Sequence, residues 1–221
     1  MSTRFSDNFI RAAEEYLWLL SKGYPQKQSL KLVGDKFMLS RDMRQVLYRG
    51  ISSSEKADHR SGLIGTVKEG DRVLIDTYNV LFTVSNYLLG KPVFICNDGI
   101  LRDAGEMRGR IVNKPIFNSA VGMFLEVLRE WEGATYLLVL DEPVSHSGRL
   151  SIELSKDMAE MDIEGEAITV PSPDRMLKNE ESDAICTSDT AIIDHYGGCL
   201  VDLPRYLLTK YYQPEFPELI L

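Results

Sequence analysis

The amino-acid sequence predicts an α/β protein, with a doubly wound, mainly parallel sheet preceded by a small all-helical domain. From residue 72 onward, short apolar runs alternate with segments of helical periodicity. Several of these runs are apolar at nearly every position, which is typical of parallel strands covered by helices on both faces. Before residue 59, apolar residues recur at helical spacing instead, and Gly and Pro separate the segments.

Residues 1–58 are expected to form the helical domain. Ser6 is a suitable N-cap for a first helix, and two further helices are expected at 26–37 and 40–51. The short break between these two is typical of a helix-turn-helix. Arg41 and Arg44 share one face of the later helix, where a recognition helix carries its phosphate and base contacts. A solvated face on a small helical bundle explains the same residues equally well.

Residues 59–71 are polar and contain glycine, which predicts a linker to a second domain at 72–221. In that domain we expect strands at 72–76, 92–98, 135–143, 166–171, 184–189 and 199–203. The expected helices lie at 79–90, 118–133, 149–161 and 190–197.

The composition is that of a folded soluble protein, with 44% hydrophobic and 26% charged residues. No apolar run is long enough to cross a bilayer, so we expect no membrane partner. The three cysteines lack metal-type spacing, and buried thiols in the reducing cytoplasm are the expected interpretation. Glycine-rich phosphate motifs are absent, which disfavours a nucleotide cofactor.

The net charge of −8 is unevenly distributed. Residues 1–60 contain 11 Lys and Arg against 7 Asp and Glu, a balance of +4, whereas the remaining residues contain 14 against 26, a balance of −12. A basic head on an acidic body predicts two units with different partners.

Four expected strands end in aspartate: Asp76, Asp98, Asp141 and Asp189. The carboxyl ends of parallel strands lie at one edge of the sheet, where ligands of such folds bind. Two carboxylates about 4 Å apart repel by roughly 4 kcal/mol at an effective dielectric constant near 20, so they take up protons or bind a cation. Oxygen ligands alone favour Mg²⁺ or Mn²⁺. Turn-forming aspartates would explain one or two of these positions.

The segments "IDTYNVL", "LVLDEPVSHSG" and "ICTSDTAIID" resemble the strand ends of the PIN-like nuclease superfamily, particularly its NYN branch. Nearly the full length also resembles an uncharacterised prokaryotic family that joins a helical domain to a PIN-like body. The resemblance implies that Asp76 is the central metal ligand and catalytic acid, supported by Asn79, with Asp141 and Asp189 flanking it. It also implies an acid on a helix between the second and last motif strands. No such helix is evident here, and Asp98 or Asp103 would substitute.

Three further residues are candidates for substrate binding, beside Asn79 and the two arginines of the helical domain. Arg102 lies close behind a strand end, where it would bind a phosphate or form a salt bridge that organises the loop. Ser145 and Ser147 precede an expected helix, where hydroxyls either help to hold an anion or act as plain N-caps.

These features predict a Mg²⁺- or Mn²⁺-dependent nuclease, and the resemblance favours RNA over DNA as its partner. Two alternatives stay open: a non-catalytic nucleic-acid-binding protein with a degenerate PIN-like domain, and a metal-dependent phosphatase. The apolar C-terminal segment "YYQPEFPELIL" packs on its own body or on a second subunit of a homo-oligomer.

Overall fold

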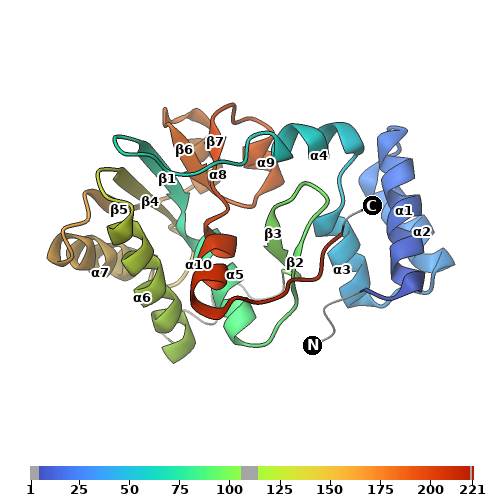
Figure 1. Ribbon diagram of the computed structural model, residues 1–221, viewed down its shortest axis with the longest axis horizontal. Helices are drawn as coiled ribbons and strands as arrows, with labels where there is room; N and C mark the ends of the chain where they lie inside the picture. Colours follow the sequence, from blue (N-terminus) through green and yellow to red (C-terminus); the bar gives the residue numbers. More distant parts are fainter. Residues whose placement is uncertain (1–4, 106–113, 220) are drawn as a thin grey trace.

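The computed structural model describes residues 5–105, 114–219 and 221, and places a helical head beside an α/β body (Figure 1). The helices of the head are α1 (Asp7–Ser21), α2 (Gln26–Lys36), α3 (Arg41–Gly50) and α4 (Ser54–Ser61). The first three confirm the expected head. The fourth extends into the expected linker, which is a correction. It forms despite its polar sequence because Ala57 and Arg60 are buried against the rest of the molecule.

The body alternates strands and helices. Its strands are β1 (Arg72–Asp76), β2 (Val93–Ile95), β3 (Leu101–Asp103), β4 (Thr135–Asp141), β5 (Gly165–Val170), β6 (Ala184–Cys186) and β7 (Cys199–Leu200). Its helices are α5 (Thr77–Leu88), α6 (Pro115–Glu130), α7 (Ser147–Glu160), α8 (Pro173–Asn179), α9 (Thr190–Ile193) and α10 (Leu203–Tyr212). Helix α8 was not expected. The other helices lie where their periodicity predicted them, apart from α10, which follows the last strand.

Five of the strands form one parallel sheet in the order β5-β4-β1-β6-β7. This confirms the predicted mainly parallel sheet. The chain builds outward from β1 through β4 to β5, and then returns to the other side of β1 for β6 and β7. The strand order therefore reverses between β1 and β6, and in open α/β sheets the crevice at such a reversal is where ligands bind.

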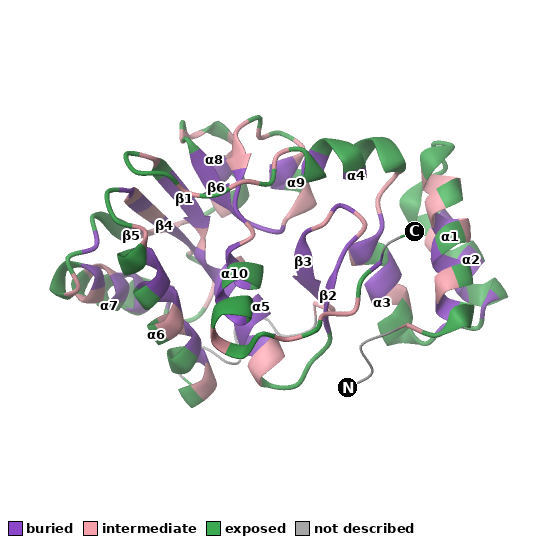
Figure 2. Ribbon diagram, viewed as in Figure 1, coloured by how far each residue is buried: buried purple, intermediate pink, exposed green. Residues whose placement is uncertain are grey.

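Both faces of this sheet are covered. Successive residues of a strand point to opposite faces, and in β1 the side chains of Val73 and Ile75 join one apolar core while Leu74 joins another. The first core includes residues of α5, α6, α7 and α10, and the second includes residues of α8 and α9. The buried colouring of the strands in Figure 2 reflects this double cover. Helices on both sides explain why the strands are apolar throughout.

The strand expected at 92–98 does not join the sheet. Its first part is β2, which pairs antiparallel with β3 in a separate two-stranded ribbon. Gly99 adopts a positive φ of 79° in the connection and lets the chain reverse within five residues. A parallel pairing would need a crossover of a dozen or more residues. Asp98 therefore lies in a hairpin turn and not at the end of a parallel strand.

The hairpin joins the head to the body. Phe94 and Cys96 complete the apolar core of the head, together with Leu219 from the C-terminal segment. The backbone amide of Leu219 donates to the carbonyl of Ile95 at 2.9 Å, so this segment packs on its own chain. Gly50 lies against Phe94 and Leu219 with no room for a Cβ atom. None of the helices in the described ranges is long and apolar enough to span a membrane.

Candidate functional site

The candidate site lies at the carboxyl edge of the sheet, around Asp76. This residue ends the central strand β1, one position before α5 begins. It occupies the N-cap position of α5, but its side chain makes no capping hydrogen bond. The main hydrogen bond of the carboxylate comes instead from Thr187, and the backbone amide of Asn79 in the first turn of α5 interacts with it less strongly.

The segment after β6 holds Asp76 from the neighbouring strand. The hydroxyl of Thr187 donates to Asp76 Oδ2 at 2.9 Å and accepts the backbone amide of Asp189 at 3.1 Å. Asn79 binds the same segment, because its Oδ1 accepts both the amide and the hydroxyl of Ser188, each at 2.9 Å. These contacts span the point where the strand order reverses, so the structure brings Asp76, Asn79 and Asp189 together.

The electrostatic environment of Asp76 is unfavourable for a carboxylate. Its pKa is raised to about 7, mainly by burial and to a smaller extent by the charges of Asp189 and Asp174. The hydrogen bond from the hydroxyl of Thr187 and the backbone amide of Asn79 stabilise the charged carboxylate and so oppose this rise in pKa. Within the described part of the chain, no ion pair involves Asp76. The residue as a whole is half-buried, so this part of the sheet edge is not sealed from solvent.

The two flanking aspartates differ in their surroundings. Asp189 Oδ1 accepts the amide of Ala191 at 2.7 Å and so caps the short helix α9. Asp141 ends β4 at the same edge and lies close enough to Tyr78 that its charge, after burial, helps to raise the pKa of that phenol to about 12. The hydroxyl of Tyr78 is buried and has no hydrogen-bond partner among the residues that the structure describes.

Asp98 and Arg102 lie away from this edge, in the hairpin. They form a buried bidentate ion pair with N–O distances of 2.8 and 2.9 Å. Arg102 therefore organises a loop, which was one of the two interpretations of its position. The carboxylate of Asp103 also has partners: it forms an ion pair with Arg49 at 3.6 Å and accepts a hydrogen bond from the hydroxyl of Thr83 at 3.0 Å. We leave both acids out of the candidate metal site because arginines already neutralise them.

Neither Ser145, which precedes α7, nor Ser147, which is its first residue, acts as its N-cap. His146 occupies the N-cap position with a left-handed φ of 70° and makes no side-chain capping bond. Ser147 is buried and donates its hydroxyl to the carbonyl of Glu142 at 3.1 Å, and Ser145 is exposed. The loop thus presents Ser145 to solvent beyond the end of β4, whereas Ser147 serves the loop itself.

The arginines of α3 are placed differently from each other. Arg41 is exposed at the first residue of the helix. Arg44 donates from Nε to the carbonyl of Leu39 at 3.0 Å and pairs with Asp35 at 2.9 Å, which ties α3 to α2. The guanidinium of Arg44 is thereby committed to the packing of the head.

Three residues of the site were missed in the sequence. Asp174 lies in the first turn of α8, and Thr187 and Ser188 connect β6 to Asp189. The signal for Asp174 was its place directly after an edge strand, in the segment "PSPDRM". The signal for the hydroxyl residues was the run "TSD" at a strand end, where small polar side chains can bond the neighbouring strand.

Among the described residues, no group of three or more His, Cys, Asp or Glu side chains is arranged to hold a metal ion. Magnesium sites that act on phosphates commonly use only one or two carboxylates, with water and substrate phosphate completing the shell. The half-buried Asp76, with its raised pKa and its neighbour Asp189, fits a divalent cation held in that way.

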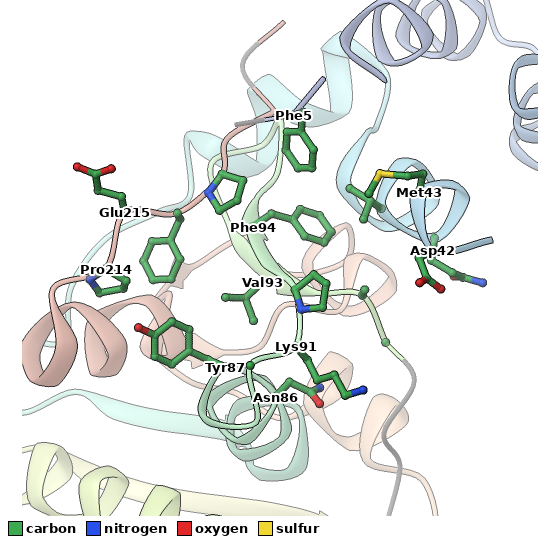
Figure 3. A pocket seen from close by; sticks show the side chains of 18 of the residues that line it. Phe5, Asp42, Met43, Asn86, Tyr87, Lys91, Val93, Phe94, Pro214 and Glu215 are labelled. Atoms are coloured by element: carbon green, nitrogen blue, oxygen red, sulfur yellow. The ribbon is translucent and has the colours of Figure 1, made fainter. Parts of the chain in front are cut away.

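A large cavity among the described residues lies elsewhere. It has a volume of about 850 Å³ and opens between α3, the end of α5, the hairpin and the C-terminal segment (Figure 3). Phe5, Tyr87 and Phe94 contribute to its mainly apolar wall. Asp76 and this cavity are at opposite ends of α5, about 15 Å apart along a helix of this length. We therefore place the chemistry at the sheet edge, where the polar groups converge.

Comparisons with known proteins define the family. The model of a domain of unknown function, DUF5616, matches residues 67–206, and that of a protein of unknown function, DUF434, matches residues 8–62. Over 185 residues the chain is 29% identical to the uncharacterized protein MJ0935 of Methanocaldococcus jannaschii, covering 83% of this chain and 88% of that protein. No solved structure matches the chain significantly. Because the first match spans more than half of the sequence, the chain belongs to the DUF5616 family.

Proposed function

We propose that the protein is a divalent-metal-dependent nuclease that cleaves phosphodiester bonds, in RNA rather than DNA. The observation that carries this proposal is the carboxylate of Asp76. It lies at the reversal point of the sheet, its pKa is raised to about 7, its acidic neighbours are Asp189 and Asp174, and it has no ion-pair partner among the described residues. Perturbed carboxylates in such a crevice are typical of functional sites.

Each residue has a distinct role in this proposal. Asp76 and Asp189 hold the Mg²⁺ or Mn²⁺ ion, with Asp141 flanking them at the end of β4. Thr187 and Asn79 keep the two strands' ends in register through their hydrogen bonds. A divalent ion bound there would position a water and stabilise negative charge on the phosphate.

The resemblance to the PIN-like superfamily supports the same assignment. It implied an acid on a helix between the second and last motif strands, for which the sequence offered no evident candidate. Helix α8 lies between β4 and β6 in the chain, and its first turn carries Asp174 near Asp76. Asp174 takes this role in the proposal. The preference for RNA rests on the resemblance alone.

The test is cleavage of a labelled single-stranded RNA by the full chain, with Mn²⁺ and with chelator. We expect metal-dependent cleavage that Asp76→Asn reduces by at least about 100-fold, as loss of a central ligand would. The matched control is Asp71→Asn, because Asp71 precedes the same strand at the opposite edge of the sheet and its side chain accepts the backbone amide of Lys68. Equal cleavage by wild type and Asp76→Asn, or in chelator, would refute the proposal.

A second candidate is a non-catalytic nucleic-acid-binding protein. One observation favours it: within the described ranges, no group of three or more His, Cys, Asp or Glu side chains is arranged to hold a metal ion. It predicts salt-dependent RNA binding that Asp76→Asn and chelator leave unchanged, with no cleavage under any condition. The same RNA, used in a binding assay, separates the two functions.

A further inference from the structure

A buried arginine binds the segment that carries Asp189 of the candidate site. Arg102 is 2% exposed, and its Nε donates to the carbonyl of Ser188 at 2.8 Å. On the other side of the same residue, Asn79 accepts the amide and hydroxyl of Ser188. Ser188 is therefore held from both sides, and Asp189 follows it directly in the chain.

The same arginine is anchored to the head through a chain of ion pairs. Both terminal nitrogens of Arg102 bind Asp98, and Asp98 is in turn 3.3 Å from Arg60 of α4. Arg60 is 3% exposed and also binds Asp194, at the end of α9, at 2.6 and 3.0 Å. Lys56 binds the same carboxylate at 3.0 Å. Lys56 and Arg60 of α4 thus bind the Asp194 end of this segment directly, and Arg60 is linked to the Ser188 end through Asp98 and Arg102.

We infer that Arg102, anchored by Asp98 and Arg60, is a positioning residue for the candidate site. The head, through Arg60 of α4, therefore helps to maintain the geometry of that site. This inference rests on the proposed function. Arg102 sets the position of Ser188, and Ser188 sets the position of the Asp189 carboxylate relative to Asp76.

The geometry explains why this position needs arginine. A guanidinium carries donors on three nitrogens in a rigid fork, so one side chain can bind a carboxylate bidentately and still donate from Nε to a carbonyl. Lysine provides a single ammonium and cannot reproduce both contacts. The carbonyl of Ser188 lies in a buried environment, where an unpaired acceptor costs free energy.

The experiment compares variants of the full chain. The main variant combines Arg102→Met with Asp98→Asn, so that no buried carboxylate is left without its partner and the protein still folds. The matched control is Arg72→Met, because Arg72 also binds a carbonyl and a carboxylate, those of Glu181 and Glu180, at the amino end of β1. Asp76→Asn reports on the proposed site itself. The readouts are Mn²⁺ affinity by electron paramagnetic resonance and amide exchange by NMR.

We expect the double variant to exchange the amides of Ser188 and Asp189 on the order of tenfold faster than wild type, because the segment is released. Its Mn²⁺ affinity should fall by about 10- to 100-fold, as for other residues that orient metal ligands. Arg72→Met should leave both values unchanged.

If the folded double variant showed wild-type amide exchange or wild-type Mn²⁺ affinity, the inference would be overturned. The proposed function would still stand in that case, provided that Asp76→Asn loses Mn²⁺ binding. Wild-type Mn²⁺ affinity in Asp76→Asn would instead refute the proposed site, and the inference with it. The two failures are therefore distinguishable.

Discussion

Several aspartates lie at the head–body interface and several at the carboxyl edge of the sheet, but their electrostatic surroundings are opposite. Those at the interface are paired with cationic side chains, whereas Asp76 at the sheet edge lies near other carboxylates. At the interface, Asp98, Asp103 and Asp194 are each bound by arginine, and Asp194 by lysine as well. There the pKa of Asp194, although burial opposes it, is lowered to about 2 by Arg60 and Lys56. At the sheet edge, the pKa of Asp76 is raised to about 7.

The difference separates acids that are paired within the fold from the acids that we propose to be functional. A buried carboxylate with a fixed cationic partner is fully satisfied and has no capacity left for a ligand. A carboxylate that stays beside other carboxylates costs stability, and proteins keep such groups mainly where function needs them. Sequence position alone does not make this distinction, since both classes occur as aspartates next to short apolar runs.

The largest effect should come from breaking the interface. We expect Arg102→Met to lower the free energy of unfolding by about 3–5 kcal/mol, because Asp98 loses its bidentate partner in a buried position. Urea denaturation of the full chain measures this loss, and adding Asp98→Asn should recover part of it. A loss below about 1 kcal/mol would show that the interface acids do not depend on their arginines.

At the sheet edge, we expect removal of a carboxylate to raise the free energy of unfolding instead of lowering it. The pKa of Asp76 rises from 3.8 to about 7 on folding, so the folded state binds its proton more tightly than the unfolded state. Without divalent ions, stability therefore falls as pH rises from about 4 to 7, and the cost is complete above pH 7. Allowing for partial exposure of the residue, Asp76→Asn should stabilise the metal-free protein by about 2–3 kcal/mol at pH 8 and by much less near pH 4. Urea denaturation at both pH values measures it, and an equal difference at both would contradict the raised pKa.

The smallest effect on stability should come from an exposed ion pair that lies outside both the interface and the sheet edge. Lys36 binds both oxygens of Glu15 at 2.7 and 2.8 Å, but the two side chains are 59% and 42% exposed. We expect Lys36→Met to change the free energy of unfolding by no more than about 1 kcal/mol, and less at high salt. Thermal denaturation provides the measurement. A larger change would mean that charge pairs in the head matter as much as those at the interface.

Much of the body could be predicted because its signals are local. The expected strand at 72–76 coincides with β1, and Asp76 ends it as predicted. A fully apolar run bounded by polar residues specifies a buried strand whatever its neighbours are. The alternation of such runs with helical periodicity was enough to predict a doubly wound sheet.

The hairpin and α8 could not be predicted in the same way. The run "VFIC" is apolar enough for the main sheet, yet Phe94 and Cys96 pack against the head instead. Helix α8 has only seven residues, too few to establish a period, and so Asp174 was overlooked. In both cases the outcome depends on which distant surface the segment meets.

The charge asymmetry has an explanation that composition did not suggest. Arg49, Lys56 and Arg60 of the basic head pair with aspartates of the acidic body. Part of the positive excess therefore matches the body and does not need an external partner. Complementary charges on two units of one chain produce the same count as a basic nucleic-acid-binding head.

The amino-acid sequence by itself determined the strands of the parallel sheet, most of the helices and the position of Asp76 at a strand end, because apolar periodicity and turn residues act over a few neighbours. Only the tertiary structure decided which aspartates meet cations and which meet one another. Electrostatic pairing depends on distances between residues that are up to 138 positions apart in the chain, as Lys56 and Asp194 are, and no local pattern encodes those distances.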